Sequence, residues 1–274
     1  MFKKIISKIR TFLHIHSHGF GCCLTCAHRD SPNGKNKDGG KHHHIDYGYI
    51  RTGKNYIKNF ERACFVNRRD SLLGIPRELI HAHTLLLGIV GGMLEENSDK
   101  PVPNEKQGSA ISRRFVLTAA FIQGISLCEQ SILQACYLQA GNLIRQEFEA
   151  LGQLAEIAKN ERKDGKSFNA KHAPWNARKH YGELSTIAHL SDHKTLESII
   201  GYNNTWGDFA ATVPQYRKDM AIKFYGFHVS MILELVYELK YLYNEIYNYE
   251  ADEKENDVIA NVVGILTQLK VFKS

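Results

Sequence analysis

A row of large apolar side chains near the C-terminal end constrains the fold of this chain more than any other feature. Within residues 214–249 these side chains recur at intervals of three and four: Met220, Phe224, Phe227, Met231, Leu235, Leu239, Leu242 and Ile246. This spacing places them on one side of an α-helix. We therefore predict a long core helix, which requires further helices with apolar faces to cover it.

The rest of the chain supplies such helices. We predict helices over 54–69, over 76–96, and over two stretches of 111–162 that bend near Ala140 and Gly141. A short helix should end at His189, and a last one should contain Ile259, Val262, Val263, Leu266 and Leu269. Residues 97–108 and 164–176 read as loops, and 199–213 as a small β-hairpin. The prediction is an all-α, multi-helix bundle with a small β-hairpin insertion.

Positive charge is concentrated at the start of the chain. Residues 1–70 contain 14 Lys and Arg against 5 Asp and Glu, whereas the remainder contains 21 against 24. An anionic partner, either a membrane surface or a nucleic acid, is therefore expected to meet residues 1–70. We predict a boundary between an irregular basic extension, residues 1–53, and the helical bundle, residues 54–274.

The first thirteen residues predict a basic amphipathic helix, with Phe2, Ile5 and Ile9 among its apolar positions. Such a helix can lie on an anionic membrane or dock on the protein's own core. Lys8 and Arg10 interrupt the apolar stretch that a secretory signal requires. No run reaches the ~18–20 apolar residues of a transmembrane helix, so the cytoplasm is the expected location.

Cysteine and histidine cluster after this first helix. Cys22, Cys23, Cys26 and His28 include one Cys-x-x-Cys pair, and seven of the 14 histidines fall within residues 14–44. Thiolate and imidazole together favour Zn²⁺ in a closed structural site. The pattern lacks a second Cys-x-x-Cys, so a mobile basic linker is the alternative interpretation.

Two helical segments carry polar side chains beside apolar ones. Arg145 and Glu149 lie on one, and Tyr181, Ser185 and His189 recur at four-residue intervals on the other. If the two helices pack together, these groups form either a catalytic or binding site or a buried network that fixes helix register. No tight turn presents Ser185 as a nucleophile.

At these residues the chain resembles the HEPN superfamily of helical proteins. The resemblance is carried by Leu143, Arg145 and Glu149 in a Leu-x-Arg-x-x-x-Glu pattern, and by a Tyr-x-x-Leu-Ser-x-x-x-His pattern that starts at Tyr181. It covers roughly residues 111–249. It implies a bundle of four or five helices, frequent homodimers and, in some relatives, metal-independent RNA cleavage in microbial defence or toxin systems.

The ribonucleases of that superfamily use an Arg-x(4–6)-His motif in a late helix. Two stretches match its spacing, Arg10 to His16 and Arg77 to His83, but neither lies late in the chain, and chance predicts about as many. Arg178 precedes His180 by only two residues. The resemblance therefore supports the fold more than the nuclease.

Three functions are consistent with these features, and whether the protein is an enzyme stays open. The first is a non-catalytic HEPN-like module that binds a nucleotide, RNA or a partner protein, in a defence setting. The second is a ribonuclease toxin, with Arg145 and His189 or Arg77 and His83 as catalytic pairs. The third is a membrane-surface or interaction protein recruited by its first helix.

Overall fold

The computed structural model describes residues 47–174, 178–204 and 207–271. The predicted N-terminal amphipathic helix and the Cys/His-rich segment with Cys22, Cys23, Cys26 and His28 lie outside these residues. The chain divides into two compact units, Met1–Arg51 and Thr52–Ser274. The second unit contains the hydrophobic core of the described residues.

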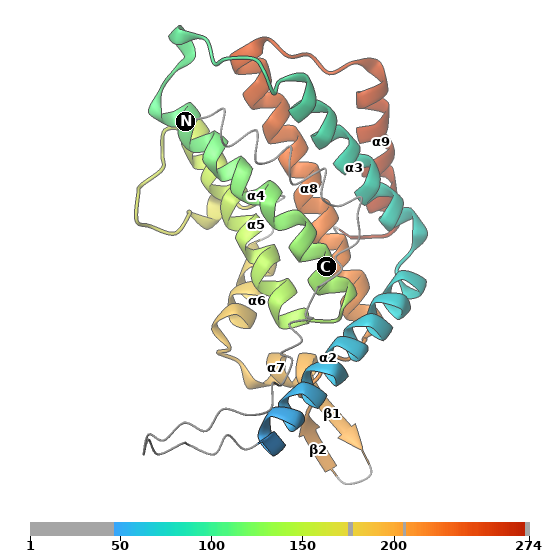
Figure 1. The fold of residues 1–274 in the computed structure, drawn as a ribbon. Helices are drawn as coiled ribbons and strands as arrows, with labels where there is room; N and C mark the ends of the chain where they lie inside the picture. The colour runs from blue at the N-terminus through green and yellow to red at the C-terminus, as the bar shows by residue number, and fades with distance from the viewer. Residues whose placement is uncertain (1–46, 175–177, 205–206, 272–274) are drawn as a thin grey trace, which may run out of the picture. The chain divides into compact units, whose positions relative to one another are not determined.

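The described residues form a helical bundle with one small hairpin, as predicted (Figure 1). The α-helices are α2 (Tyr47–Gly74), α3 (Arg77–Glu96), α4 (Ser109–Leu133), α5 (Tyr137–Ala158), α6 (Arg178–His189), α7 (His193–Ile200), α8 (Lys218–Tyr247) and α9 (Glu253–Gln268). Two short 3₁₀ helices are η1 (Asn104–Lys106) and η2 (Ala170–His172). Strands β1 (Gly201–Asn204) and β2 (Gly207–Ala210) pair antiparallel, with Gly201 opposite Ala210.

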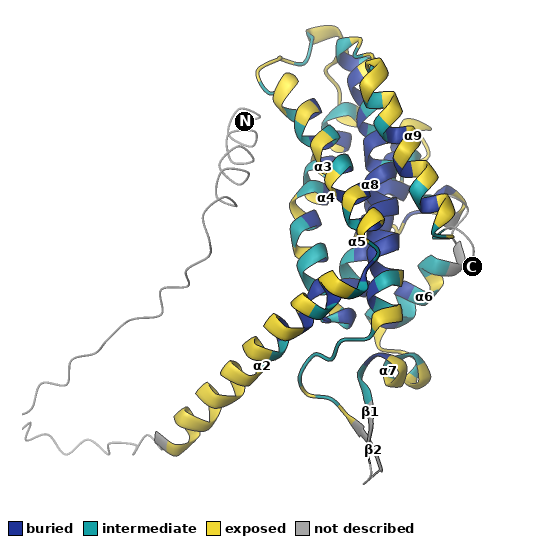
Figure 2. Ribbon diagram, turned by 90° about the vertical axis from the view of Figure 1, so that its right-hand side faces the viewer, coloured by how far each residue is buried: buried dark blue, intermediate teal, exposed yellow. Residues whose placement is uncertain are grey.

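Helix α8 is the central element of the bundle. Helices α3, α4 and α5 pack against it, α9 packs against α3, and α6 packs against α5. Every residue from 224 to 233 is buried, so this part of α8 is covered on all sides and not only along the predicted apolar stripe (Figure 2). A helix buried all round must place any polar side chain it carries inside the protein.

The bend predicted near Ala140 and Gly141 is wrong. The chain breaks instead at Gln134 to Cys136, where Ala135 adopts a left-handed conformation with φ of 61°. Gly141 lies inside α5, and a Cβ there would come within 2.9 Å of Ile187 on α6. The absence of a side chain at Gly141 therefore allows α6 to pack closely against α5.

Two other boundaries differ from the sequence prediction. Helix α2 extends from Tyr47 to Gly74, well beyond the predicted 54–69, and α7 was not predicted. Asp192 caps the N-terminus of α7, where its carboxylate accepts a hydrogen bond from the backbone N–H of Thr195. Asp192 is a typical N-cap residue, but it comes three residues after the end of α6, so the sequence did not reveal a separate helix.

Two helices are apolar and long enough to cross a membrane when only length and composition are considered. These are α4, in which 33% of the most apolar window is buried, and α8, in which 72% is buried. The core helix of a soluble bundle has the same properties, so the feature is weak evidence for a membrane span.

Candidate functional site

A cluster of polar side chains lies where α3, α4, α5 and α8 meet. We call it the core cluster; its members are His83, Cys128, Glu147 and His228. All four residues are buried. Glu147 and His228 interrupt the apolar stripes of their helices, because Glu147 lies between Ile144 and Leu151 and His228 lies between Phe224 and Met231. Polar groups in such positions need partners inside the protein.

Glu147 and His228 face each other between α5 and α8. His228 Nδ1 lies 2.8 Å from Glu147 Oε1, and the two side chains are 0% and 4% exposed. Among the residues that the structure describes, no hydrogen bond of normal geometry satisfies either carboxylate oxygen or either ring nitrogen. Removing an ion pair from water costs several kcal/mol per ion, and good geometry with further polar partners is needed to recover it. The pair is therefore incompletely satisfied.

Cys128 brings a thiol from α4 to the same point. Burial and the neighbouring Glu147 raise the pKa of this thiol well above its usual range. The thiol of Cys128, the carboxylate of Glu147 and the imidazole of His228 have ligand atoms within 4.8 Å of one another. These three buried residues could hold a metal ion.

His83 closes the cluster on the α3 side. Its ring centroid lies 5.3 Å from that of His228 and 5.4 Å from that of Tyr225. Its Nδ1 is 3.6 Å from Glu129 Oε1, and the Tyr225 hydroxyl donates a hydrogen bond to the same oxygen at 3.0 Å. Burial, together with His228, lowers the pKa of His83 to about 3. The His83 imidazole is therefore neutral at physiological pH.

The predicted site on the other side of α5 is partly assembled. Arg145 and Glu149 each lie two residues from Glu147, so they point away from the core cluster and toward α6. Arg145 Nη2 is 2.8 Å from Glu149 Oε1, and the Tyr181 hydroxyl donates to that same oxygen at 3.0 Å. The Arg145 guanidinium also lies 5.8 Å from the centre of the Tyr181 ring. These three residues form a half-buried network.

Ser185 and His189 do not join this network. Both lie on α6 as predicted, but His189 is exposed at its last residue. Within the described ranges, no hydrogen bond or ion pair connects either residue to Arg145 or Glu149. Eight residues of helix separate His189 from Tyr181 by about 12 Å, which carries the imidazole away from the guanidinium. The predicted Arg145–His189 pair is therefore not assembled.

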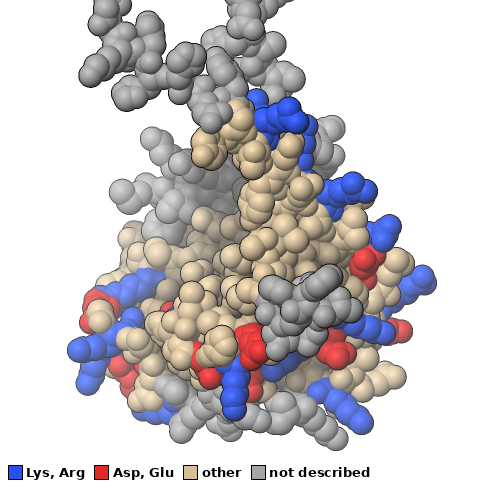
Figure 3. All heavy atoms as spheres, turned by 90° about the horizontal axis from the view of Figure 1, so that it is seen from below, with Lys and Arg blue, Asp and Glu red and all other residues tan. Residues whose placement is uncertain are grey.

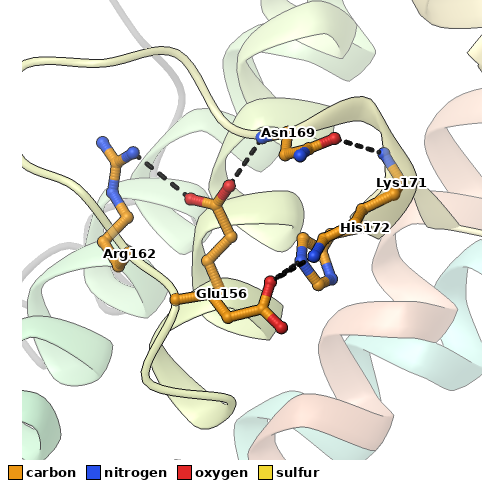
Figure 4. A network of polar contacts seen from close by, with 6 residues as sticks. Glu156, Arg162, Asn169, Lys171 and His172 are labelled. Carbon is orange, nitrogen blue, oxygen red and sulfur yellow. Dashed lines mark hydrogen bonds and ion pairs between the residues drawn. The ribbon is translucent and has the colours of Figure 1, made fainter.

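A second polar network fixes the loop between α5 and η2 (Figure 4). The buried Glu156 carboxylate accepts a hydrogen bond from the backbone N–H of Asn169 at 2.6 Å and pairs with Arg162 at 3.3 Å. Lys171 and His172 both contact the Glu161 carboxylate, at 2.5 and 2.9 Å.

The loop between α5 and η2 contacts the Arg145, Glu149 and Tyr181 network through the ring of Phe168. It holds Phe168 against Gly152 of α5 and 4.9 Å from the Tyr181 ring, edge to face. The Glu156 and Glu161 contacts are therefore structural, and through Phe168 they help to orient Tyr181.

Helix α2 presents a row of cations to solvent. We call it the α2 row; it consists of Lys54, Lys58, Arg62 and Arg69, all exposed. The first three are one turn apart on the same side of the helix. Phe65 lies among them and is 75% exposed. Figure 3 shows the face seen from below, where several Lys and Arg side chains lie along one edge with acidic side chains among them.

Sequence analysis did not predict the core cluster. A detectable signal was the placement of Glu147 and His228 inside apolar stripes, where a charged or titratable side chain is rare. No pattern in the sequence indicated that these two residues, which lie on different helices, share one point in space. That depends on how α3, α4, α5 and α8 pack.

Comparison with protein-family models, with curated proteins and with solved structures gave no match in any of the three. The HEPN resemblance therefore rests on the residues quoted above.

Proposed function

We propose that the protein is a non-catalytic, HEPN-like helical module that binds RNA through the α2 row. The observation that carries the proposal is the row itself, four exposed cations over about four turns of one helix. Of these cations only Arg69 has an ion-pair partner among the described residues, the adjacent Asp70 at 2.8 Å. Cations that are free of acidic partners can neutralise phosphates and release their counterions.

The exposed ring of Phe65 favours RNA among anionic partners. Single-stranded nucleic acids bind where cations follow the backbone and an aromatic side chain offers a flat surface for a base. Phe65 is three residues from Arg62 and four from Arg69, so its ring lies on the cation-bearing side of α2. This arrangement fits a short unpaired segment of RNA.

Three placements support a non-catalytic module over the ribonuclease alternative. His83 is buried and neutral, whereas Arg77 is exposed. His189 is exposed and lies apart from Arg145. Acid–base catalysis needs a titratable group within reach of the scissile phosphate and a cation beside it. Neither predicted pair provides both. We further propose that the protein forms a homodimer and acts in microbial defence, because some of the proteins it resembles do so. We propose a cytoplasmic location on the basis of the sequence.

The proposal is tested with the full-length protein and fluorescein-labelled oligouridine. Lys58→Ala/Arg62→Ala should weaken binding and lower the salt dependence of the affinity, by a log–log slope of about 0.7 per lost phosphate contact. The matched control is Lys159→Ala/Lys163→Ala, which removes the same charge from exposed positions outside α2. The control should leave that slope unchanged.

The aromatic surface is tested separately. Phe65→Ala should weaken RNA binding by about 1–3 kcal/mol, while Tyr237→Ala, which removes an exposed aromatic ring from α8, should have no effect. Equal losses in the α2 variants and their controls would overturn the proposal, as would an absence of RNA binding. Shortened RNA after incubation would favour the ribonuclease. Binding to anionic vesicles alone, lost on deletion of residues 1–16, would favour the membrane-surface protein.

Zinc at Cys22, Cys23, Cys26 and His28 stays a proposal for the N-terminal segment. It is supported by the Cys-x-x-Cys spacing and the local concentration of histidine. Protein purified without a nickel step should carry zinc that is lost in Cys22→Ser/Cys23→Ser/Cys26→Ser. Unchanged zinc content in that variant would contradict this site.

A further inference from the structure

The core cluster contains more polar atoms than the protein satisfies. Within the described part of the chain, Glu147 Oε1 and His228 Nδ1 contact each other at 2.8 Å without hydrogen-bond geometry, and Glu147 Oε2, His228 Nε2 and His83 Nε2 also lack a hydrogen bond of normal geometry. The side chains of these three residues are at most 4% exposed. Buried polar atoms are rarely left in this state, and several at one point indicate a missing partner.

The chemistry of these atoms identifies the kind of partner. A thiol, a carboxylate and an imidazole within 4.8 Å of one another are a mixed S, O and N donor set. Zinc accepts all three donor types at about 2.0–2.3 Å, which places tetrahedral ligand atoms about 3.3–3.8 Å apart. The 2.8 Å between Glu147 and His228 is shorter than this and the 4.8 Å limit is longer. The spacings of the three ligand atoms therefore span the range found around a bound zinc ion.

His83 lies beside this set of three, with its ring centroid 5.3 Å from that of His228. Its Nδ1 faces Glu129 Oε1 at 3.6 Å, and the Tyr225 hydroxyl holds that carboxylate at 3.0 Å. Histidine ligands commonly direct one ring nitrogen at a carboxylate and the other at the metal. With Nδ1 turned to Glu129, Nε2 of His83 is the nitrogen left for an ion.

We propose that Cys128, Glu147, His228 and His83 bind one zinc ion in the interior of the bundle. Each of the four helices α3, α4, α5 and α8 supplies one ligand, so the ion would join them at their common packing point. Binding replaces the thiol proton of Cys128, which is released to solvent, and gives the Glu147 carboxylate a cation in place of an incomplete ion pair. The site is structural, because its four ligands leave no position open.

Metal content of the full-length protein tests the assignment. The protein is purified without a nickel step, stripped with a chelator, reloaded with zinc and analysed by mass spectrometry. We expect the core-cluster zinc to be lost in Cys128→Ser and retained in Cys22→Ser/Cys23→Ser/Cys26→Ser, which removes the thiols of the N-terminal segment. His83→Leu should lower zinc affinity at least about ten-fold.

A second measurement does not depend on the folding of Cys128→Ser. A protein with Cys128 as its single cysteine is made by replacing Cys22, Cys23, Cys26, Cys64 and Cys136 with serine, and is loaded with cobalt. A thiolate-to-cobalt charge-transfer band in this protein can arise only from Cys128. We expect the band, and its loss when zinc displaces cobalt.

Three results would overturn the proposal. One is a folded Cys128→Ser protein that retains all its zinc. Another is the absence of the cobalt band from the folded single-cysteine protein. The third is a reloaded wild-type protein that binds no zinc, which would leave Glu147 and His228 as a metal-free buried ion pair.

Discussion

Replacing Gly152 with alanine should destabilise the protein, although alanine is the better helix former. Gly152 lies inside α5 and faces Phe168 of the following loop. A Cβ at this position would lie 2.2 Å from Phe168 Cδ2 and 2.6 Å from two further ring atoms. Because ordinary contacts begin near 3.4 Å, the ring has to move by more than 1 Å.

The magnitude follows from two opposing terms. Alanine in place of a helical glycine contributes about 0.5–1 kcal/mol of stability. Overpacking at a buried ring costs about 1–3 kcal/mol, and separation of the Phe168 and Tyr181 rings, now 4.9 Å apart, costs a further ~0.5–1.5 kcal/mol. The clash outweighs the helix propensity, so we expect a net loss of about 0.5–4 kcal/mol.

Thermal unfolding with a matched control measures this. Gly88 lies inside α3, is exposed, and a Cβ there would meet nothing within 4 Å. Gly88→Ala should therefore raise the Tm, whereas Gly152→Ala should lower it by about 2–4 °C per kcal/mol. Shifts of the same sign in the two variants, or an unchanged Tm for Gly152→Ala, would refute the reasoning.

Three further predictions concern titration, thiol reactivity and the predicted site. Hydrogen bonds from Lys171 and then His172 lower the pKa of Glu161 to about 2, below its ordinary 4.5. Its stabilising effect is therefore complete above pH 4.5 and is lost as the pH falls toward 2, so the Tm difference between wild type and Glu161→Gln should vanish over that range. Burial, followed by the neighbouring Cys64, raises the pKa of Cys136 from 9.0 to about 11, so iodoacetamide at pH 8 should modify it roughly 100-fold more slowly in native than in unfolded protein; equal rates would contradict this. Arg145→Ala should cost about 1 kcal/mol, because Glu149 and Tyr181 lose a half-buried partner, whereas Arg113→Ala, which breaks an exposed pair with Asp164, should leave the Tm unchanged; equal effects would show that the Arg145 network adds no stability.

Helix α5 contributes to two separate sets of polar side chains on its opposite sides, the core cluster and the Arg145, Glu149 and Tyr181 network. Glu147 points into the bundle, while Arg145 and Glu149 point toward α6. Changes at Arg145 should therefore leave the core cluster and its zinc content intact. A loss of zinc in Arg145→Ala would show that the two sides of α5 are coupled.

The sequence by itself determined the helices, because helical periodicity is a local property that each segment shows alone. The row from Met220 to Ile246 predicted α8, Pro76 marked the start of α3, and Gly201 to Ala210 lies within the predicted hairpin region. The sequence also placed Tyr181 on the same helix as Ser185 and His189. It failed where adjacent elements hid a boundary, at Ala135 and at α7.

Only the tertiary structure decided which side chains meet. Cys128, Glu147 and His228 come from three helices, and their convergence depends on the angle and register at which those helices pack. The same packing brings Tyr181 to Glu149 and leaves His189 in solvent. Local periodicity fixes the side of a helix on which a residue lies, but burial of apolar surface between helices fixes what that side touches.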